Sequence, residues 1–460
     1  MTVPDLAGCL YRELIGNKIH TSLRTLLLEG HGRVFALGQN FAPDGHMPGY
    51  TATQKMFLDF ERLEWSTEEI RKPQFATNEP ASHRRRTAWV NGYEFTGTDH
   101  NKKWRVAPIG LVPLFIHPLG IVRAVERRLL VLMSTATSGT ERVMEFQFLL
   151  GTRLIVVWNL ADKAVVKLSS SDYDQTLGDV TKTLVLSDHI ERAGTMLPTK
   201  IDCFVDSYVK SSFAYTQATI DGVAPFTIDD NRQAEAPKYL SLERISRRTW
   251  RYSGLYRSVL IEFPSYLVLV EAPVSGDKTK RMIQAALQLF PQKRIRYVIA
   301  THHHWDHVRG IRTAVANDAT VICHHSAYSF IHELTRRRHS ICRDELATDP
   351  RLAHIESVKD RYELSEASQS LQVYSVDGNQ HASTLLMVFI PKEGVLIEAD
   401  VYSPQTSTGE PVGPFAVNLL DNIASRRLNV SVVLPLHGQA MSFAQFKAAV
   451  SRDANVDIQC

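Results

Sequence analysis

The sequence has few cysteines, no long unbroken apolar run and little net charge, and each of these shortages removes a class of protein. Its five cysteines are odd in number and widely scattered, so they predict neither a disulfide framework nor a C-x-x-C metal site. They are Cys9, Cys203, Cys323, Cys342 and Cys460. We therefore expect buried or free thiols.

The charge balance argues against a nucleic-acid partner. Lysine and arginine number 52 and aspartate and glutamate 49, which gives a formal net charge of +3. That excess is too small to attract a polyanion over the whole surface. The densest basic run, His83-Arg84-Arg85-Arg86, lies among polar and turn-forming residues. It predicts a solvated loop, and contact with an anionic surface is the alternative.

The apolar segments predict no integral membrane segment. The longest one, Ala107–Val122, contains three prolines and a histidine and is too short to cross a bilayer, so we expect it to be buried or to line a groove. Near the N-terminus, Tyr11-Arg12-Glu13 interrupts any continuous apolar stretch, and no export signal is predicted. As given, the chain is expected to be cytoplasmic, or periplasmic or secreted if it has been trimmed. The oligomeric state stays open.

The length of 460 residues exceeds what one hydrophobic core usually organises, so two domains are predicted, 1–236 and 237–460. From Gly32 to about Asp221 the chain has short alternating or β-branched runs separated by turn residues. This pattern predicts a β-rich, mainly antiparallel accessory domain with a few helices. The polar, proline-flanked segment Ala224–Pro237 is the predicted linker.

The C-terminal half alternates strand, loop and helix, which predicts a layered α/β domain. Helices are expected at Asp277–Leu289 and Val308–Ala316. Strands are expected at 258–263, 266–270, 296–300, 320–323, 371–375, 384–390, 394–399 and 430–435.

A histidine-rich segment follows the expected strand 296–300. It reads Thr301-His302-His303-His304-Trp305-Asp306-His307. Three imidazoles and a carboxylate at alternating or adjacent positions match the ligand preferences of zinc and its neighbours. His303 and Trp305 alternate with the ligands, so we expect them to point away from a metal. A histidine cluster on a solvated turn is the structural alternative.

Other candidate ligands occur at the ends of later strands. His381 precedes the strand that begins near Thr384, Asp400 ends the strand 394–399, and His437 ends the strand 430–435. Rigid strands present side chains from the loops at their ends. One edge of a sheet can therefore gather these three residues and the histidine-rich segment into a single metal site.

This set, His302-x-His304-x-Asp306-His307 followed by His381, Asp400 and His437, resembles the metal ligands of the metallo-β-lactamase superfamily. Its spacing is similar to that of the hydroxyacylglutathione hydrolases and lactonases, and the resemblance covers roughly Leu240 to Val450. It implies a four-layer αββα sandwich. Class B β-lactamases have a cysteine in place of Asp400, and flavo-diiron proteins have a glutamate in place of His304; neither replacement occurs here.

The resemblance also implies roles for these residues and a cofactor of two Zn²⁺ per chain, with iron or manganese possible. One metal would be held by His302, His304 and His381, the other by Asp306, His307 and His437, with Asp400 bridging both. The implied enzyme is a hydrolase that uses a metal-bridging hydroxide to cleave an ester, lactone, thioester or amide-type bond in a small molecule. Asp306 and Asp400 would orient or deprotonate the water. Tyr402 would donate a proton, or would pack beside the site.

Two alternatives to a hydrolase remain open at this point. One is an iron-dependent dioxygenase of the same fold, which would hold one iron instead of two zinc ions. The other is a protein that carries a hydrophobic ligand and has a non-catalytic metal site. The second is suggested by the stretch Leu184–Asp221, which resembles the antiparallel half-barrel of periplasmic lipoprotein carriers.

Overall fold

The computed structural model describes residues 10, 14, 23–75, 81–90, 93–98, 102–106, 112–148, 151–192, 194–227, 240–254, 256–402 and 414–454. Most of the region considered for an export signal, Cys9, Cys460, part of the predicted linker and the predicted boundary at 236/237 lie outside these residues. The chain divides into two compact units. The first contains 1–37, 48–172 and 180–234, and the second contains 38–47, 173–179 and 235–460.

The first unit is built on one sheet of 13 strands in the order β6-β5-β4-β3-β2-β1-β13-β12-β11-β10-β9-β8-β7. Neighbouring strands are antiparallel, as in β1–β2 and β1–β13, so the predicted β-rich, mainly antiparallel accessory domain is confirmed. The strands are β1 (Thr25–Phe35), β2 (Gly49–Asp59), β3 (Glu64–Pro73), β4 (His83–Val90), β5 (Tyr93–Thr98), β6 (Lys102–Val106), β7 (Leu130–Ser138), β8 (Glu141–Phe148), β9 (Arg153–Asn159), β10 (Ala164–Asp174), β11 (Gly178–Arg192), β12 (Thr195–Val205) and β13 (Tyr208–Ile220).

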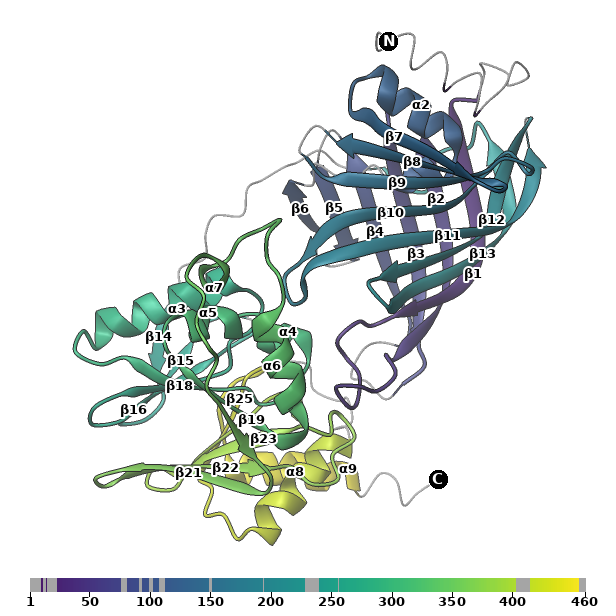
Figure 1. The fold of residues 1–460 in the computed structure, drawn as a ribbon. Helices are drawn as coiled ribbons and strands as arrows, with labels where there is room; N and C mark the ends of the chain where they lie inside the picture. The colour runs from purple at the N-terminus through teal and green to yellow at the C-terminus, as the bar shows by residue number, and fades with distance from the viewer. Residues whose placement is uncertain are drawn as a thin grey trace. The chain divides into compact units, whose positions relative to one another are not determined.

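A short helical segment packs on this sheet, and Figure 1 shows it beside β7. It consists of η2 (Val112–Ile116) and α2 (Pro118–Glu126). Helix α2 begins at Pro118 because His117 caps it: the imidazole Nδ1 accepts the Leu119 N–H at 3.2 Å, and proline is favoured in the first helical turn. Both pieces are buried in the core of the unit. The carrier-like resemblance of Leu184–Asp221, which spans β11 to β13, stays a prediction.

The basic run His83–Arg86 is not a loop, and the prediction was wrong on this point. It forms the first half of β4, where Arg86 lies opposite Glu68 on β3 and Arg85 lies opposite Glu69. The Arg86 Nε donates to Glu68 at 2.7 Å. Cross-strand pairing with acidic residues lets a sheet accommodate a charge run that composition alone assigns to solvent.

The second unit contains two sheets. The seven-stranded sheet has the order β14-β15-β16-β17-β18-β19-β20, and the six-stranded sheet has the order β21-β22-β23-β24-β25-β26. Their strands are β14 (Leu242–Arg244), β15 (Thr249–Tyr252), β16 (Val259–Glu262), β17 (Leu267–Val270), β18 (Ile295–Ile299), β19 (Thr320–His324), β20 (Ile355–Val358), β21 (Arg361–Glu366), β22 (Gln369–Ser375), β23 (Leu386–Ile390), β24 (Val395–Glu398), β25 (Val432–Pro435) and β26 (Met441–Ser442).

The helices of this unit are mostly short. They are α3 (Gly276–Leu289), α4 (Trp305–Val308), α5 (Ile311–Ala316), η3 (His325–Ala327), α6 (Tyr328–Arg336), α7 (Glu345–Thr348), α8 (Pro414–Ser425) and α9 (Phe443–Ala454). The helix predicted at 308–316 is shorter in the structure: α5 covers only Ile311–Ala316, and Val308 is the last residue of the preceding helix α4, so that Arg309-Gly310 separates the two. A Cβ at Gly310 would lie 1.9 Å from Thr279 Oγ1 of α3, so glycine permits the close approach of the two segments. No helix in the described part of the chain is long and apolar enough to span a membrane.

The apolar residues of these elements form three cores that define four layers. Successive residues of β16 alternate: Leu260 faces α3, α5 and α6, whereas Val259 and Ile261 face the other sheet. A third core joins the outer face of the six-stranded sheet to α8 and α9. Figure 1 shows these helices on the outer sides of the two sheets. The predicted αββα sandwich is therefore confirmed.

Candidate metal centre

The predicted ligands meet at one edge of the sandwich because several strands end there. The histidine-rich segment follows β18, Asp400 follows β24, and His437 follows β25. Strand β17 runs parallel to β18 and is followed by Glu271 at the same edge. Asp400 and Glu271 both adopt left-handed backbone conformations, with φ of 63° and 75°. Such conformations cost energy for residues other than glycine and are frequent at functional sites.

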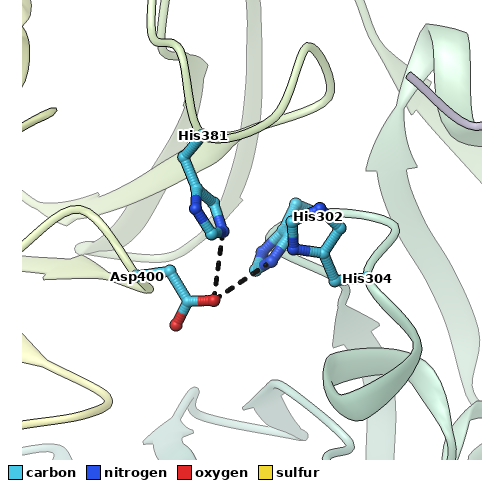
Figure 2. A group of neighbouring side chains, drawn as sticks. All are labelled: His302, His304, His381 and Asp400. Carbon is cyan, nitrogen blue, oxygen red and sulfur yellow. Dashed lines mark ion pairs between the residues drawn. The ribbon is translucent and has the colours of Figure 1, made fainter. Parts of the chain in front are cut away.

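Asp400 lies at the centre of this group. Its Oδ2 is 3.0 Å from His307 Nε2 and 3.1 Å from His381 Nε2. The same oxygen is 3.5 Å from His302 Nε2, and the other oxygen, Oδ1, is 2.7 Å from His437 Nε2. Figure 2 shows the carboxylate between the rings of His381 and His302. One carboxylate therefore faces imidazoles from four different positions in the chain.

Three sets of ligand atoms, each within 4.8 Å of one another, share members of this group. They are His302, His304, His381 and Asp400; His307, Asp400 and His437; and Glu271, His302 and His307. Six of the seven residues named from the sequence thus lie in these sets. The seventh, Asp306, has its Oδ2 3.6 Å from His307 Nε2.

Hydrogen bonds from the protein fix the rings of the buried histidines. The Thr301 hydroxyl lies 3.0 Å from His302 Nδ1, and the carbonyl oxygen of Asn40 lies 3.0 Å from His304 Nε2. The carboxylate of Glu271 lies 2.7 Å from His307 Nδ1. Each ring thus uses one nitrogen for the protein and presents the other to the cluster, the arrangement that sets the tautomer of a metal ligand.

The environment also sets the charges. Burial lowers the pKa of His302 well below its usual value, and the charge of His307 acts in the same direction. Burial likewise lowers the pKa of His304. At His307 burial acts to lower the pKa, but the carboxylates of Asp400 and Glu271 outweigh it and raise the pKa well above the usual value. Burial therefore favours the neutral, metal-binding form of His302 and His304, whereas the carboxylates beside His307 favour its protonated form.

The hydrogen bonding of the buried histidines also fits a metal site, and this observation is independent of the spacing of the ligands in the sequence. The cluster-facing nitrogens His302 Nε2, His304 Nδ1, His307 Nε2 and His381 Nε2 are buried and make no well-formed hydrogen bond, and three of them share one oxygen of Asp400 as their nearest polar neighbour. Buried polar atoms without partners cost free energy. Imidazole nitrogens and carboxylate oxygens are donors that zinc prefers. Metal ions bound by the sets His302, His304, His381 and Asp400 and His307, Asp400 and His437 would satisfy all four nitrogens.

Sequence reasoning missed Glu271. It is fully buried, and its Oε1 accepts the backbone N–H of Thr301 at 3.0 Å while its Oε2 faces His307. Glu271 therefore holds both the start of the histidine-rich segment and one of its rings. A signal was present: a carboxylate directly follows the apolar strand that pairs in parallel with β18.

Sequence reasoning also missed a loop far upstream. Residues 38–47, which follow β1, belong to the second unit. The Gln39 side-chain amide donates to Asp306 Oδ1 at 2.7 Å, and the Asn40 carbonyl faces His304. Gly38 lies against Trp305, where a Cβ would come within 2.1 Å of the indole, and its carbonyl accepts the Trp305 N–H. Nothing in the local sequence of this loop indicates its role.

The bystanders of the motif lie away from the cluster. His303 Nδ1 is 2.6 Å from the Thr384 hydroxyl, and His303 is in none of the three ligand sets of the described chain. Tyr402 packs against Phe446 at a centroid distance of 5.1 Å, within the core formed with α8 and α9. A different tyrosine lies at the cluster.

That residue is Tyr256, which sequence reasoning did not single out. Its ring lies 4.8 Å from the ring of His437, edge to face. Burial raises the pKa of its phenol, and the carboxylates of Asp306 and Asp400 raise it further. The phenol is therefore protonated at neutral pH and has a proton to donate.

Comparisons with known proteins address the family. Among curated proteins, no match is found. Solved structures that resemble the chain include a metallo-beta-lactamase from Pontibacter korlensis (14% identity, covering 47% of this chain and 99% of that one, TM-score 0.37). Another is FIM-1 from Pseudomonas aeruginosa in its mono-zinc form (15% identity, covering 48% and 96%, TM-score 0.37). A sequence model of the Metallo-beta-lactamase superfamily matches residues 255–401. This part of the chain is a metallo-beta-lactamase superfamily domain.

Proposed function

We propose that this protein is a hydrolase with two zinc ions, and that it cleaves an ester, lactone, thioester or amide-type bond in a small molecule. One observation carries the proposal: buried imidazole nitrogens that make no well-formed hydrogen bond converge, together with His437 Nε2, on the single carboxylate of Asp400. One carboxylate cannot satisfy so many buried imidazole nitrogens, so a purely structural role for this group would cost stability.

In this proposal His302, His304 and His381 hold one ion. Asp306, His307 and His437 hold the other, and Asp400 binds both. Two divalent ions bound there would supply a water whose pKa falls towards about 7, and would polarise the scissile carbonyl. The set of residues leaves no need for a serine or cysteine nucleophile.

The chain's own groups would then handle protons. Asp400 and Asp306 would orient the attacking water and accept its proton, and the Gln39 amide, which donates to Asp306, would keep that carboxylate in place. Tyr256, beside His437, is our candidate to donate a proton to the leaving group or to bind the developing oxyanion. Tyr402 remains a weaker candidate for the same role because its ring packs on Phe446.

The first test combines hydrolysis with metal analysis. The purified chain is assayed on chromogenic esters, lactones, thioesters and cephalosporins, with and without a chelator, and its metals are counted by elemental analysis. We expect about two zinc ions per chain, loss of hydrolysis on chelation and recovery on adding zinc. One iron per chain with oxygen uptake and no hydrolysis would instead identify the dioxygenase alternative.

A further inference from the structure

A second polar feature lies in the same unit and takes no part in the metal centre. It is a cavity of about 520 Å³, in the size range of small-molecule sites, which runs from about 300 to 1,000 Å³. Six arginines line it: Arg312, Arg336, Arg337, Arg338, Arg343 and Arg351. Within the described chain no carboxylate is among the lining residues.

Some of these cations have structural partners. Arg312 makes a two-point contact with Asp344, at 2.5 and 3.0 Å. Arg351 pairs with Asp349 at 2.8 Å and also with Asp318. Such pairs neutralise a guanidinium and remove its need for an external anion. They account for two of the six arginines.

Helix α6 ends at this cavity, and basic residues often occupy helix C-termini to balance free carbonyls. Arg312 already performs that task, because it donates to the carbonyls of Leu334, Thr335 and Arg337 at 3.3, 2.6 and 3.1 Å. The next arginine, Arg336, has no hydrogen bond or ion pair with the described residues, so the helix end does not explain it.

Two more arginines make few contacts with acceptor groups of the protein. Arg343 donates only to the backbone carbonyl of Ala347, at 3.1 Å, in the described chain. Arg338 is 82% exposed and lies 3.6 Å from Asp179, whose oxygens already accept the N–H groups of Ser340 and Ile341. The cavity thus keeps uncompensated positive charge.

A buried histidine adds an independent observation. His339 lines the cavity with its side chain only 1% exposed, and neither ring nitrogen has a hydrogen-bond partner. The ring lies edge to face with Tyr173 at 5.6 Å and 3.5 Å from an oxygen of Asp344. Burial lowers its pKa, so the neutral ring offers one N–H donor that the protein does not use.

We infer that this cavity is a binding site for a phosphate group, either the free ion or one carried by a small molecule. Guanidinium forks match the geometry of phosphate oxygens, and a phosphate brings nearly two negative charges and several acceptors. The cavity is larger than a single phosphate ion requires, which favours a phosphorylated small molecule. The inference does not depend on the reaction at the metal centre.

The test is calorimetric titration of the full chain with inorganic phosphate, adenosine monophosphate and adenosine, at low and matched ionic strength. The variant R336Q/R343Q removes the two least compensated cations. R247Q/R281Q removes two exposed arginines elsewhere in the same unit and is the matched control. Melting curves check that both variants fold.

We expect phosphate or the nucleotide to bind, adenosine not to bind, and affinity to fall more than about tenfold in R336Q/R343Q but not in the control. If only inorganic phosphate binds, the free ion is the ligand; if the nucleotide binds as well, a phosphorylated small molecule is. The inference is overturned by unchanged binding in R336Q/R343Q, by binding that His302→Ala abolishes, or by no binding up to about 10 mM.

Discussion

The two halves of the metal centre differ in how firmly the chain holds them. The side chains of His302 and His307 are 0% and 2% exposed, whereas those of His381 and His437 are 17% and 20% exposed. The ring of His302 is fixed by a hydrogen bond with Thr301, and that of His307 by one with Glu271. In the described chain, no such bond reaches the ring nitrogens of His381 or His437, which face Asp400.

This difference separates two requirements of the proposed metal centre. Buried rings locked in one tautomer set metal affinity, because little is left to reorganise when the ion binds. The more exposed rings lie on the side where solvent, and therefore substrate, can approach. The comparison predicts that the buried histidines, His302 and His307, control how tightly the metal ions bind. It also predicts that replacing a residue that supports a ligand has a smaller effect the farther that residue lies from the ligand atoms.

The largest effect is expected from His302→Ala and His304→Ala. Each removes one of three imidazoles from the first ion, and two ligands no longer fix its geometry. Hydrolysis should fall by more than about a thousandfold, and elemental analysis should find less zinc. His332→Ala, on helix α6, is the control and should retain both. Full zinc content in either variant would contradict the prediction that the buried histidines control metal binding.

Replacing the shared carboxylate comes next. Asp400→Ala leaves the repulsion between two cations unshielded, so we expect loss of the second ion and a fall in turnover of at least about a hundredfold. Titration of the metal-free protein with zinc, followed by assay, measures both. An Asp400→Ala protein that holds two ions tightly at near-normal turnover would rule out the bridging role.

His303→Ala probes the same segment one residue away from two ligands. Its ring bonds to Thr384 and not to the cluster, so both ions should stay bound. Turnover should fall by no more than the roughly 10–100-fold seen when a residue supporting a metal ligand is lost. If His303 were essential and His304 dispensable, the register assigned to the motif would be wrong.

The smallest effect is expected at the upstream loop. Gln39→Ala removes the amide that holds Asp306, so affinity for the second ion should weaken about tenfold while the first ion stays unaffected. Competition with a chromogenic zinc chelator resolves the two affinities. Gln292→Ala, an exposed residue before β18, is the matched control. Equal weakening of both ions would mean that the loop supports the fold and not Asp306.

Much of the site was predictable because its signal is local. The candidate ligands between His302 and His307 can be recognised because they alternate with other residues directly after an apolar strand. The αββα order can be predicted because the hydrophobic periodicity of each strand and helix is a short-range feature of the sequence. Glu271 and the Asn40 carbonyl escaped because their roles arise from which strands and loops become neighbours. Every residue has a backbone carbonyl, so no sequence pattern can predict which carbonyl will contact a ligand.

The errors have the same origin. The run His83–Arg86 was assigned to a loop because the acidic residues that pair with it lie on the neighbouring strand β3. The apolar periodicity continues through Arg309-Gly310 and so predicts one helix, whereas in the structure these two residues separate α4 from α5, and Gly310 packs closely against Thr279 of α3. Both are matters of tertiary contact.

The position of the segment 38–47 has a consequence for how this protein can be divided or recombined. Its residues are encoded more than half the chain ahead of the histidines they support, yet they belong to the same compact unit. A gene fragment that starts after the first unit would encode every proposed metal ligand but not the carbonyl beside His304 or the amide beside Asp306. The second unit is therefore not a portable module, and exchanging the N-terminal half between relatives would exchange part of the candidate metal centre with it.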